Sequence, residues 1–170
     1  MKCSIPGVGV FYLYGKYFIE NIICDNMKKR CYVDTCIYLN LWQKEVEKKT
    51  GVKLWKLAQI FFEKAEENGF NIYYSGFILK ELSYILSKNE FYNKKLLFES
   101  SPNFERLILS REEFEEARKI ENEINLEISF FDIIHIILAR KSNSILVTRD
   151  KKLIKIADIY NVEAKKPEEL

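Results

Sequence analysis

The sequence predicts an α/β domain in which a central parallel β-sheet lies between two layers of helices. The length of 170 residues fits one domain and hardly leaves room for two. Hydrophobic residues make up 48% of the chain and charged residues 31%, which is typical of a soluble globular protein with a sizeable core. From residue 31 onward, short apolar segments alternate with longer segments of helical periodicity. Strands separated by helices form parallel sheets that helices cover on both faces.

Residues 1–26 differ from the rest of the chain. Segments 8–14 and 17–24 are rich in Val, Ile, Phe and Tyr, and Gly15-Lys16 lies between them, which predicts a β-hairpin. A basic run at 28–30 then precedes the first buried strand. We therefore expect an N-terminal hairpin extension over residues 1–26 and one folded domain over residues 27–170.

The first half of the domain contains clear helix stops and starts. Thr50-Gly51 separates two helices, Gly69 ends the second, and Ser75 is placed to cap the helix that follows it. The predicted elements are strands 31–33 and 70–74 and helices 35–48, 52–68, 75–87 and 90–100.

The second half follows the same alternation. Ser110 and Glu113 form a capping-box pattern, the helix that begins at Ser129 is almost wholly apolar, and Pro167 follows the last strand. The predicted elements are strands 104–109, 144–148 and 161–164 and helices 110–124, 129–139 and 151–158.

Charge and composition exclude several classes of protein. The 27 Lys and Arg residues nearly balance the 25 Asp and Glu residues, which argues against a non-specific nucleic-acid coat. No stretch reaches the about 18 consecutive apolar residues of a membrane span, and the N-terminus lacks the order of a signal peptide, so we expect a cytoplasmic protein. Four cysteines without a Cys-x-x-Cys pair, together with a single histidine, argue against a zinc site.

Two aspartates stand directly after predicted strands. Asp34 follows the strand at 31–33, and Asp150 follows the strand at 144–148. Ligands of open α/β sheets bind outside the carboxyl ends of the strands, so both are candidates for one pocket. The alternative for each is a helix-capping aspartate.

Two further acids stand among apolar residues. Asp132 begins an almost wholly apolar helix, where an unpaired buried carboxylate costs several kcal/mol. A cation, a metal, or the helix amides near Ser129 would compensate for this cost. Glu81 falls within the apolar stripe of its helix, and its alternative is an edge residue that reaches solvent.

Four carboxylates at one rim would repel one another, and a divalent cation removes this repulsion. Ligand sets of oxygen atoms suit Mg²⁺ or Mn²⁺ better than Zn²⁺. Such ions serve phosphoryl chemistry, which indicates a phosphodiester or phosphate ester as the substrate.

The four acids occur in the order and context of a known family. The sequence resembles the PIN domain family, which includes the VapC-type toxins of toxin–antitoxin pairs, over about residues 28–170. The matching motifs are YVDT at 32–35, LKEL at 79–82, FDIIH at 131–135 and LVTRD at 146–150.

The resemblance implies a Mg²⁺- or Mn²⁺-dependent ribonuclease with a parallel sheet between helices. It further implies a homodimer and an antitoxin segment that blocks the acidic pocket. Thr35 and Thr148 correspond to residues that support the site, and His135 is common at its position, where we favour a structural, hydrogen-bonding role. The residues that correspond to the family's catalytic, metal-binding acids are Asp34, Glu81, Asp132 and Asp150.

Three positions depart from the family pattern. Cys36 stands where Asn or Ser is common, and Lys152 and Leu153 stand where many toxins have another Asp and an aromatic residue. These differences weaken the toxin assignment more than the nuclease assignment.

The substrate side of the predicted pocket carries a local excess of positive charge. Segment 140–155 holds six basic residues against one acid, and the candidates for phosphate binding are Arg140, Arg149, Lys151 and Lys152. Their alternative is ordinary solvated side chains. Tyr73, Tyr74 and Phe77 are placed to stack on unpaired bases, or else they belong to the core.

Three functions are compatible with these observations. The first is a metal-dependent endoribonuclease that cleaves single-stranded or structured RNA, as a toxin or in RNA processing. The second is a non-catalytic PIN scaffold that binds RNA or a protein partner. The third, a phosphatase of the haloacid dehalogenase type, fits poorly because Cys36 stands where that chemistry needs a second aspartate.

Overall fold

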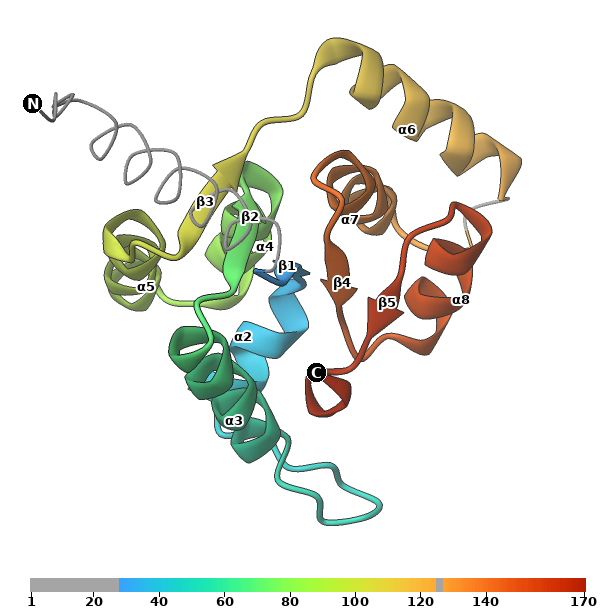
Figure 1. Ribbon diagram of the computed structural model, residues 1–170. Helices are drawn as coiled ribbons and strands as arrows, with labels where there is room; N and C mark the ends of the chain where they lie inside the picture. Colours follow the sequence, from blue (N-terminus) through green and yellow to red (C-terminus); the bar gives the residue numbers. More distant parts are fainter. Residues whose placement is uncertain (1–27, 125–126) are drawn as a thin grey trace, which may run out of the picture.

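The computed structural model describes residues 28–124 and 127–170 and confirms the predicted α/β class (Figure 1). Five parallel strands form one sheet in the order β3-β2-β1-β4-β5. The strands are β1 (Arg30–Val33), β2 (Asn71–Ser75), β3 (Phe104–Leu107), β4 (Ile145–Val147) and β5 (Ala164–Lys165).

Helices cover both faces of this sheet. The chain leaves β1 toward β2 and β3 and then reverses toward β4 and β5, and right-handed connections place the helices of the two directions on opposite faces. The first group is α2 (Thr35–Trp42), α3 (Leu54–Glu67), α4 (Gly76–Ile85) and α5 (Lys88–Ser100). The second group is α6 (Arg111–Glu123), α7 (Phe130–Lys141) and α8 (Lys151–Ile159), and a 3₁₀ turn (Pro167–Glu169) follows β5.

The hydrophobic core lies between the sheet and both helix layers. The central strands β1 and β4 contribute fully buried side chains, among them Tyr32, Val33 and Leu146. Helix α7 is buried at every position from 133 to 139, which explains its almost wholly apolar sequence. This burial fixes the start of α7 beside the carboxyl ends of β1 and β4.

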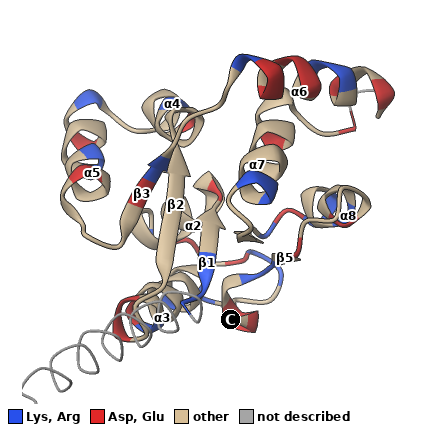
Figure 2. Ribbon diagram, turned by 45° about the horizontal axis from the view of Figure 1, so that its top comes forward, with Lys and Arg blue, Asp and Glu red and all other residues tan. Residues whose placement is uncertain are grey.

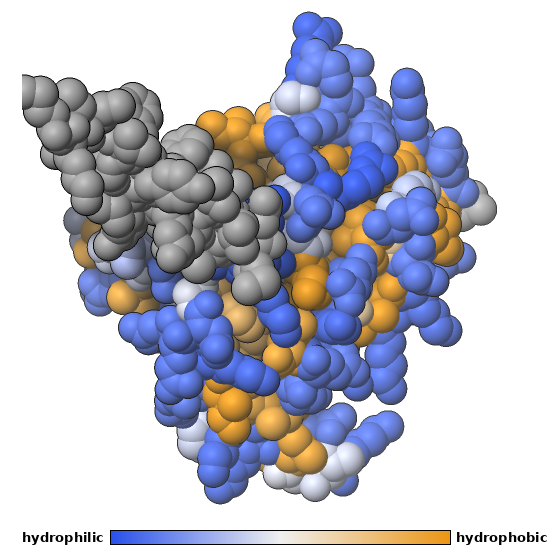
Figure 3. Space-filling model, in the orientation of Figure 1, coloured by the Kyte–Doolittle hydropathy of each residue, from blue (hydrophilic) through white to orange (hydrophobic). Residues whose placement is uncertain are grey.

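The segment between α2 and α3 differs from the prediction. Helix α2 ends at Trp42 instead of continuing to residue 48, and α3 begins at Leu54. Lys44 and Gly51 take left-handed backbone angles there (φ 54° and 74°), which ends helical geometry. Figure 3 shows hydrophobic patches among hydrophilic side chains toward this end of the molecule.

Two predicted strands are shorter or shifted. The ladder of β3 ends at Leu107 because its partner β2 ends at Ser75, and Ile108 is 76% exposed beyond it. Strand β5 begins at Ala164 instead of residue 161, since Asn161 has a left-handed backbone (φ 57°) and belongs to the turn after α8.

The predicted hairpin at 8–24 and the boundary at residue 27 fall outside the described residues. In the part of the chain that the structure describes, none of the helices has both the length and the apolar character that crossing a bilayer requires.

Candidate metal-binding active site

A pocket opens where the residues that follow β1 and β4 meet. These two strands are neighbours, but the chain leaves them toward opposite ends of the sheet. Their carboxyl ends therefore form a topological switch point, the usual place of ligand binding in open α/β sheets. The pocket has a volume of about 510 Å³, and its lining includes all four predicted acids: Asp34, Glu81, Asp132 and Asp150.

Asp34 is held rigidly at the end of β1. Its backbone N–H donates to Val147 of β4 at 3.0 Å, and its Oδ2 accepts a 2.6 Å bond from the hydroxyl of Thr148. The Cys36 thiol donates to the same oxygen at 3.0 Å. The carboxylate makes no side-chain cap on α2, so the helix-capping alternative does not hold for Asp34.

Glu81 reaches the pocket from α4. Its Oε2 accepts bonds from Thr35 Oγ1 at 2.5 Å and from His135 Nε2 at 3.1 Å. Partial burial opposes ionisation, but the bond and charge of His135, together with the bond from Thr35, hold the pKa of Glu81 below its usual value. Glu81 is thus a half-buried, ionised carboxylate that faces the pocket, and the alternative of an edge residue that reaches solvent does not hold.

His135 makes the kind of hydrogen bonds that the sequence analysis favoured for it, and they bring it to the site. It is fully buried, and its Nδ1 lies 3.0 Å from the hydroxyl of Tyr32, which in turn lies 2.7 Å from Ser75 Oγ. Its ring therefore connects the core of the sheet to Glu81. The spacing of three residues after Asp132 on one helix, and the position of Tyr32 two residues before Asp34 on one strand, are the sequence signals of this arrangement.

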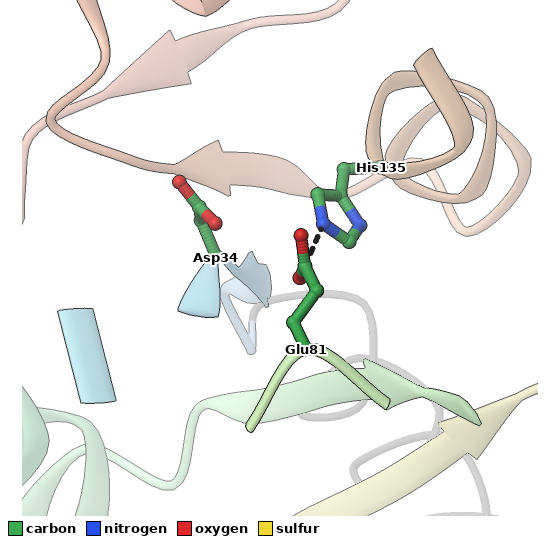
Figure 4. Close-up of side chains that lie close together, drawn as sticks. All are labelled: Asp34, Glu81 and His135. Atoms are coloured by element: carbon green, nitrogen blue, oxygen red, sulfur yellow. Dashed lines mark hydrogen bonds and ion pairs between the residues drawn. The ribbon is translucent and has the colours of Figure 1, made fainter. Parts of the chain in front are cut away.

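Asp34, Glu81 and His135 form the tightest cluster of ligand-type groups among the described residues. One candidate ligand atom from each lies within 4.8 Å of the others. Figure 4 shows that these side chains come from the end of β1, from α4 and from α7, with Glu81 and His135 in contact and Asp34 beside them. Such a cluster is of a size to hold one cation.

Asp132 lies on the same pocket but outside that cluster. It forms a capping box with Ser129 at the start of α7: Ser129 N donates to Asp132 Oδ2 at 2.9 Å, and Asp132 N donates to Ser129 Oγ at 3.1 Å. Burial raises the pKa of Asp132 above its usual value, although the Ser129 bonds oppose this. The helix amide therefore supplies part of the compensation that its apolar surroundings require.

Asp150 is an exposed N-cap of α8. Its Oδ1 accepts bonds from the backbone N–H groups of Lys152 (2.7 Å) and Leu153 (3.1 Å). The backbone N–H of Asp150 donates to Thr148 Oγ1 at 3.1 Å, so Thr148 contacts both strand-end aspartates. The capping interpretation holds for Asp150, and its carboxylate still lines the pocket.

The structure brings only part of the predicted basic group to the pocket. Arg149 lines it, but the guanidinium is bound by Asn40 Oδ1 at 2.9 Å and by Glu168 at 2.7 Å. Arg140 lies at the far end of α7 and pairs with Glu116 at 2.6 Å, away from the acids. The exposed residues next to Asp150 are Lys151 and Lys152.

The core alternative holds for two of the three predicted stacking residues. Tyr73 and Tyr74 are 8% and 4% exposed, and Phe77 is half-buried against Phe131. The aromatic residue that does stand free at the pocket rim is Tyr84, which is 71% exposed.

Comparison with known proteins agrees with this geometry. The PIN domain family model matches residues 31–159. The chain belongs to the PIN domain family. The match covers β1 to α8 and therefore every element that carries a pocket acid. No curated protein gave a significant match to the chain.

Three solved structures resemble most of the chain. FitAcB from Neisseria gonorrhoeae is 17% identical with a TM-score of 0.57, and the match covers 82% of this chain and 99% of that one. VapBC2 from Rickettsia felis, solved with a DNA fragment from their promoter, is 21% identical with a TM-score of 0.58, over 81% and 98% of the chains. FitAB bound to an IR36 DNA fragment is 16% identical with a TM-score of 0.54, over 82% and 96% of the chains. At these identities the similarity shows the fold.

Proposed function

We propose that this PIN domain protein is a Mg²⁺- or Mn²⁺-dependent endoribonuclease and the toxin of a toxin–antitoxin pair. The observation that carries the proposal is the meeting of Asp34, Glu81 and His135 within 4.8 Å, in a pocket that Asp132 and Asp150 also line. Family membership supports the same conclusion.

The donor groups fit a hard divalent ion. The pocket offers carboxylate oxygens from the end of β1, from α4 and from the starts of α7 and α8, and its one thiol, Cys36, is engaged with Asp34. Asp34 and Glu81 would hold the ion, and Asp132 and Asp150 would complete the site from the rim. When bound, such an ion activates water and stabilises the charge of a scissile phosphate.

The residues around the acids keep them in place. Thr148 fixes Asp34 through a buried bond, and Thr35 and His135 fix the same oxygen of Glu81. Holding these carboxylates in advance lowers the cost of organising the site when the substrate arrives. Lys151 and Lys152, exposed next to Asp150, would attract the RNA phosphates.

The fold also supports a proposed partner. FitAcB, FitAB and VapBC2 are all complexes in name. We propose that a small antitoxin covers the acidic pocket of this chain. We further propose that two copies of the chain form a homodimer in the cytoplasm. Light scattering of the protein alone and with the product of the neighbouring gene checks the stoichiometry.

Cleavage of RNA by matched variants tests the catalytic proposal. The wild type should cleave structured RNAs with Mn²⁺ and not with EDTA, and Glu81→Gln should lower the rate by about a hundredfold because it removes one ligand charge. Glu63→Gln, a change of an exposed glutamate on α3, should leave the rate unchanged. Asp132→Asn and calorimetric Mn²⁺ titration complete the set.

A non-catalytic scaffold is the second candidate. It is favoured by the helix-capping bonds of Asp132 and Asp150, which occupy one oxygen of each. RNA binding that is unchanged in an Asp34→Asn/Asp132→Asn variant, with no Mn²⁺ heat and no cleavage in the wild type, would support the scaffold and exclude the nuclease.

A further inference from the structure

A second groove lies at the carboxyl ends of β2 and β3, beside the acidic pocket. We name it the β3 groove; it has a volume of about 360 Å³ and lies between the starts of α4 and α6. We propose that the β3 groove binds the phosphates and unpaired bases of single-stranded RNA next to the cleavage site, a role that rests on the proposed function. Its lining includes Gly76, Phe77, Arg106, Arg111 and Phe114.

Arg106 gives the groove an unneutralised positive charge. Its side chain is exposed, and within residues 28–124 and 127–170 no carboxylate pairs with it. The guanidinium lies over Gly76, where a Cβ atom would be 3.2 Å from Nη2, so the absence of a side chain at Gly76 leaves room for it. A free guanidinium at a groove is suited to bidentate binding of phosphate.

Among the basic residues that the sequence predicts on the substrate side, several differ from Arg106 because they have carboxylate partners. Arg140, Lys141 and Arg149 pair with Glu116, Glu113 and Glu168, respectively. Their charges are therefore partly cancelled inside the protein. Figure 2 shows basic segments on β3 and at the first turn of α6, on the chain that forms the groove. Arg111 of α6 pairs with Glu115 at 3.1 Å, so the unpaired charge at the groove is that of Arg106.

Aromatic side chains link the groove to the acidic pocket. Phe77 of the groove packs edge-on against Phe131, with ring centroids 5.3 Å apart, and Phe131 directly precedes Asp132 of the pocket. Lys80, on the same helix as Glu81, places its ammonium group 5.7 Å from the Phe131 ring. The two binding regions are thus neighbours on one edge of the sheet.

Phe114 offers a surface for a base. It is 38% exposed at the groove, and its ring packs edge-on against Phe130 at 5.2 Å. Grooves that bind single strands combine positive charge along the backbone with aromatic side chains on which bases stack. The β3 groove contains both features, and the double helix of duplex RNA would keep its bases from reaching Phe114.

Binding of a labelled single-stranded RNA of about 12 nucleotides tests the groove without any cleavage. Fluorescence anisotropy in EDTA compares the wild type with Arg106→Gln, Phe114→Leu and the control Arg30→Gln. Arg106→Gln should weaken binding about tenfold. It should also make the negative slope of log K (the association constant) against log salt shallower by about 0.7, the value for one lost phosphate contact. Phe114→Leu should weaken binding several-fold with the slope unchanged, because stacking carries no charge.

A control variant and the possible outcomes separate the groove proposal from the ribonuclease proposal. Arg30→Gln should change the affinity less than twofold, since Arg30 begins β1 and lies at the amino edge of the parallel sheet, opposite the groove. No RNA binding by the wild type, or equal affinities of the wild type and Arg106→Gln, would overturn the groove proposal. A wild type that binds RNA through Arg106 but never cleaves it would leave the groove standing and refute the ribonuclease. Cleavage with unchanged binding by Arg106→Gln would do the reverse.

Discussion

A line of hydrogen bonds through the core positions the central carboxylate of the site. Ser75, Tyr32 and His135 are buried and bonded in sequence, and His135 and Thr35 both donate to Glu81. A buried polar chain of this kind is costly unless each member is satisfied. Its complete pairing indicates that the position of Glu81 is set by the interior of the protein and not by solvent.

The pair of His135 and Glu81 makes stability depend on pH. Burial lowers the pKa of His135, but the bond and charge of Glu81 outweigh this and raise the pKa above its usual 6.5. The pKa of Glu81 is lowered below 4.5. A histidine whose pKa is raised by folding stabilises the fold fully at a pH below its unfolded-state pKa, and this contribution is lost as the pH rises through its folded-state pKa. A glutamate whose pKa is lowered by folding stabilises the fold at a pH above its unfolded-state pKa of 4.5, and this contribution is lost as the pH falls through its folded-state pKa.

We therefore expect the pair to contribute most between pH 4.5 and pH 6.5. In EDTA, the free energy of unfolding of the wild type minus that of Glu81→Gln should fall as the pH rises above 6.5, since the variant keeps a buried histidine without its acidic partner. Urea denaturation at a series of pH values measures this difference. Two curves that stay parallel across the range would contradict the assignment.

At the scale of the element, helix starts deliver the acids to the pocket. Helices α7 and α8 begin at the carboxyl edge of the sheet; Asp132 lies in the first turn of α7, and Asp150 is the N-cap of α8. Both carboxylates accept bonds from backbone amides of the helix start, which favour negative charge at that end. Capping and pocket lining are thus properties of the same side chains.

The two capping boxes of α6 and α7 provide a matched comparison. Ser110 pairs with Glu113 on α6, and Ser129 pairs with Asp132 on α7. Ser110→Ala and Ser129→Ala should each lower the free energy of unfolding by about 1 kcal/mol, as loss of an N-cap does. Only Ser129→Ala should also weaken Mn²⁺ binding, because only its partner lines the pocket. Calorimetry and urea denaturation check both; equal Mn²⁺ affinities would contradict a role of Asp132 at the site.

At the scale of the whole molecule, the sheet order determines which strand ends meet. The strands of the switch point, β1 and β4, lie at the centre of the sheet, and both helix layers bury them. The site therefore rests on strands with fully buried side chains, while its polar groups face the pocket. Burial of the central strands supplies the stability that compensates for gathering like charges at their ends.

Core substitutions measure this support. Leu146 of β4 is fully buried, and Ile159 at the end of α8 is 70% exposed. Leu146→Ala should lower the free energy of unfolding by about 2–5 kcal/mol because it leaves a cavity. Ile159→Ala should change it by about 0.5 kcal/mol or less. Urea denaturation of both variants tests whether burial of the central strands supplies most of the stability. Similar losses of unfolding free energy in the two variants would contradict this.

The sequence by itself determined the fold class and the identity of the pocket acids. Alternation of apolar segments and helical stripes is local, so it located β1, β4 and α7, and the aspartates that follow strands could be recognised from their positions. Its boundaries were wrong where a left-handed residue ends a helix, as at Lys44.

Only the tertiary structure decided which charges remain free and which are paired. Arg149 meets Glu168 and Asn40, Arg140 meets Glu116, and Arg106 meets no carboxylate among the described residues. His135 and Glu81 are 54 positions apart, yet they share a hydrogen bond. Periodicity reports on neighbours within one element, whereas such contacts depend on how separate elements pack. For this reason the sequence determined the acids that line the pocket but not their partners.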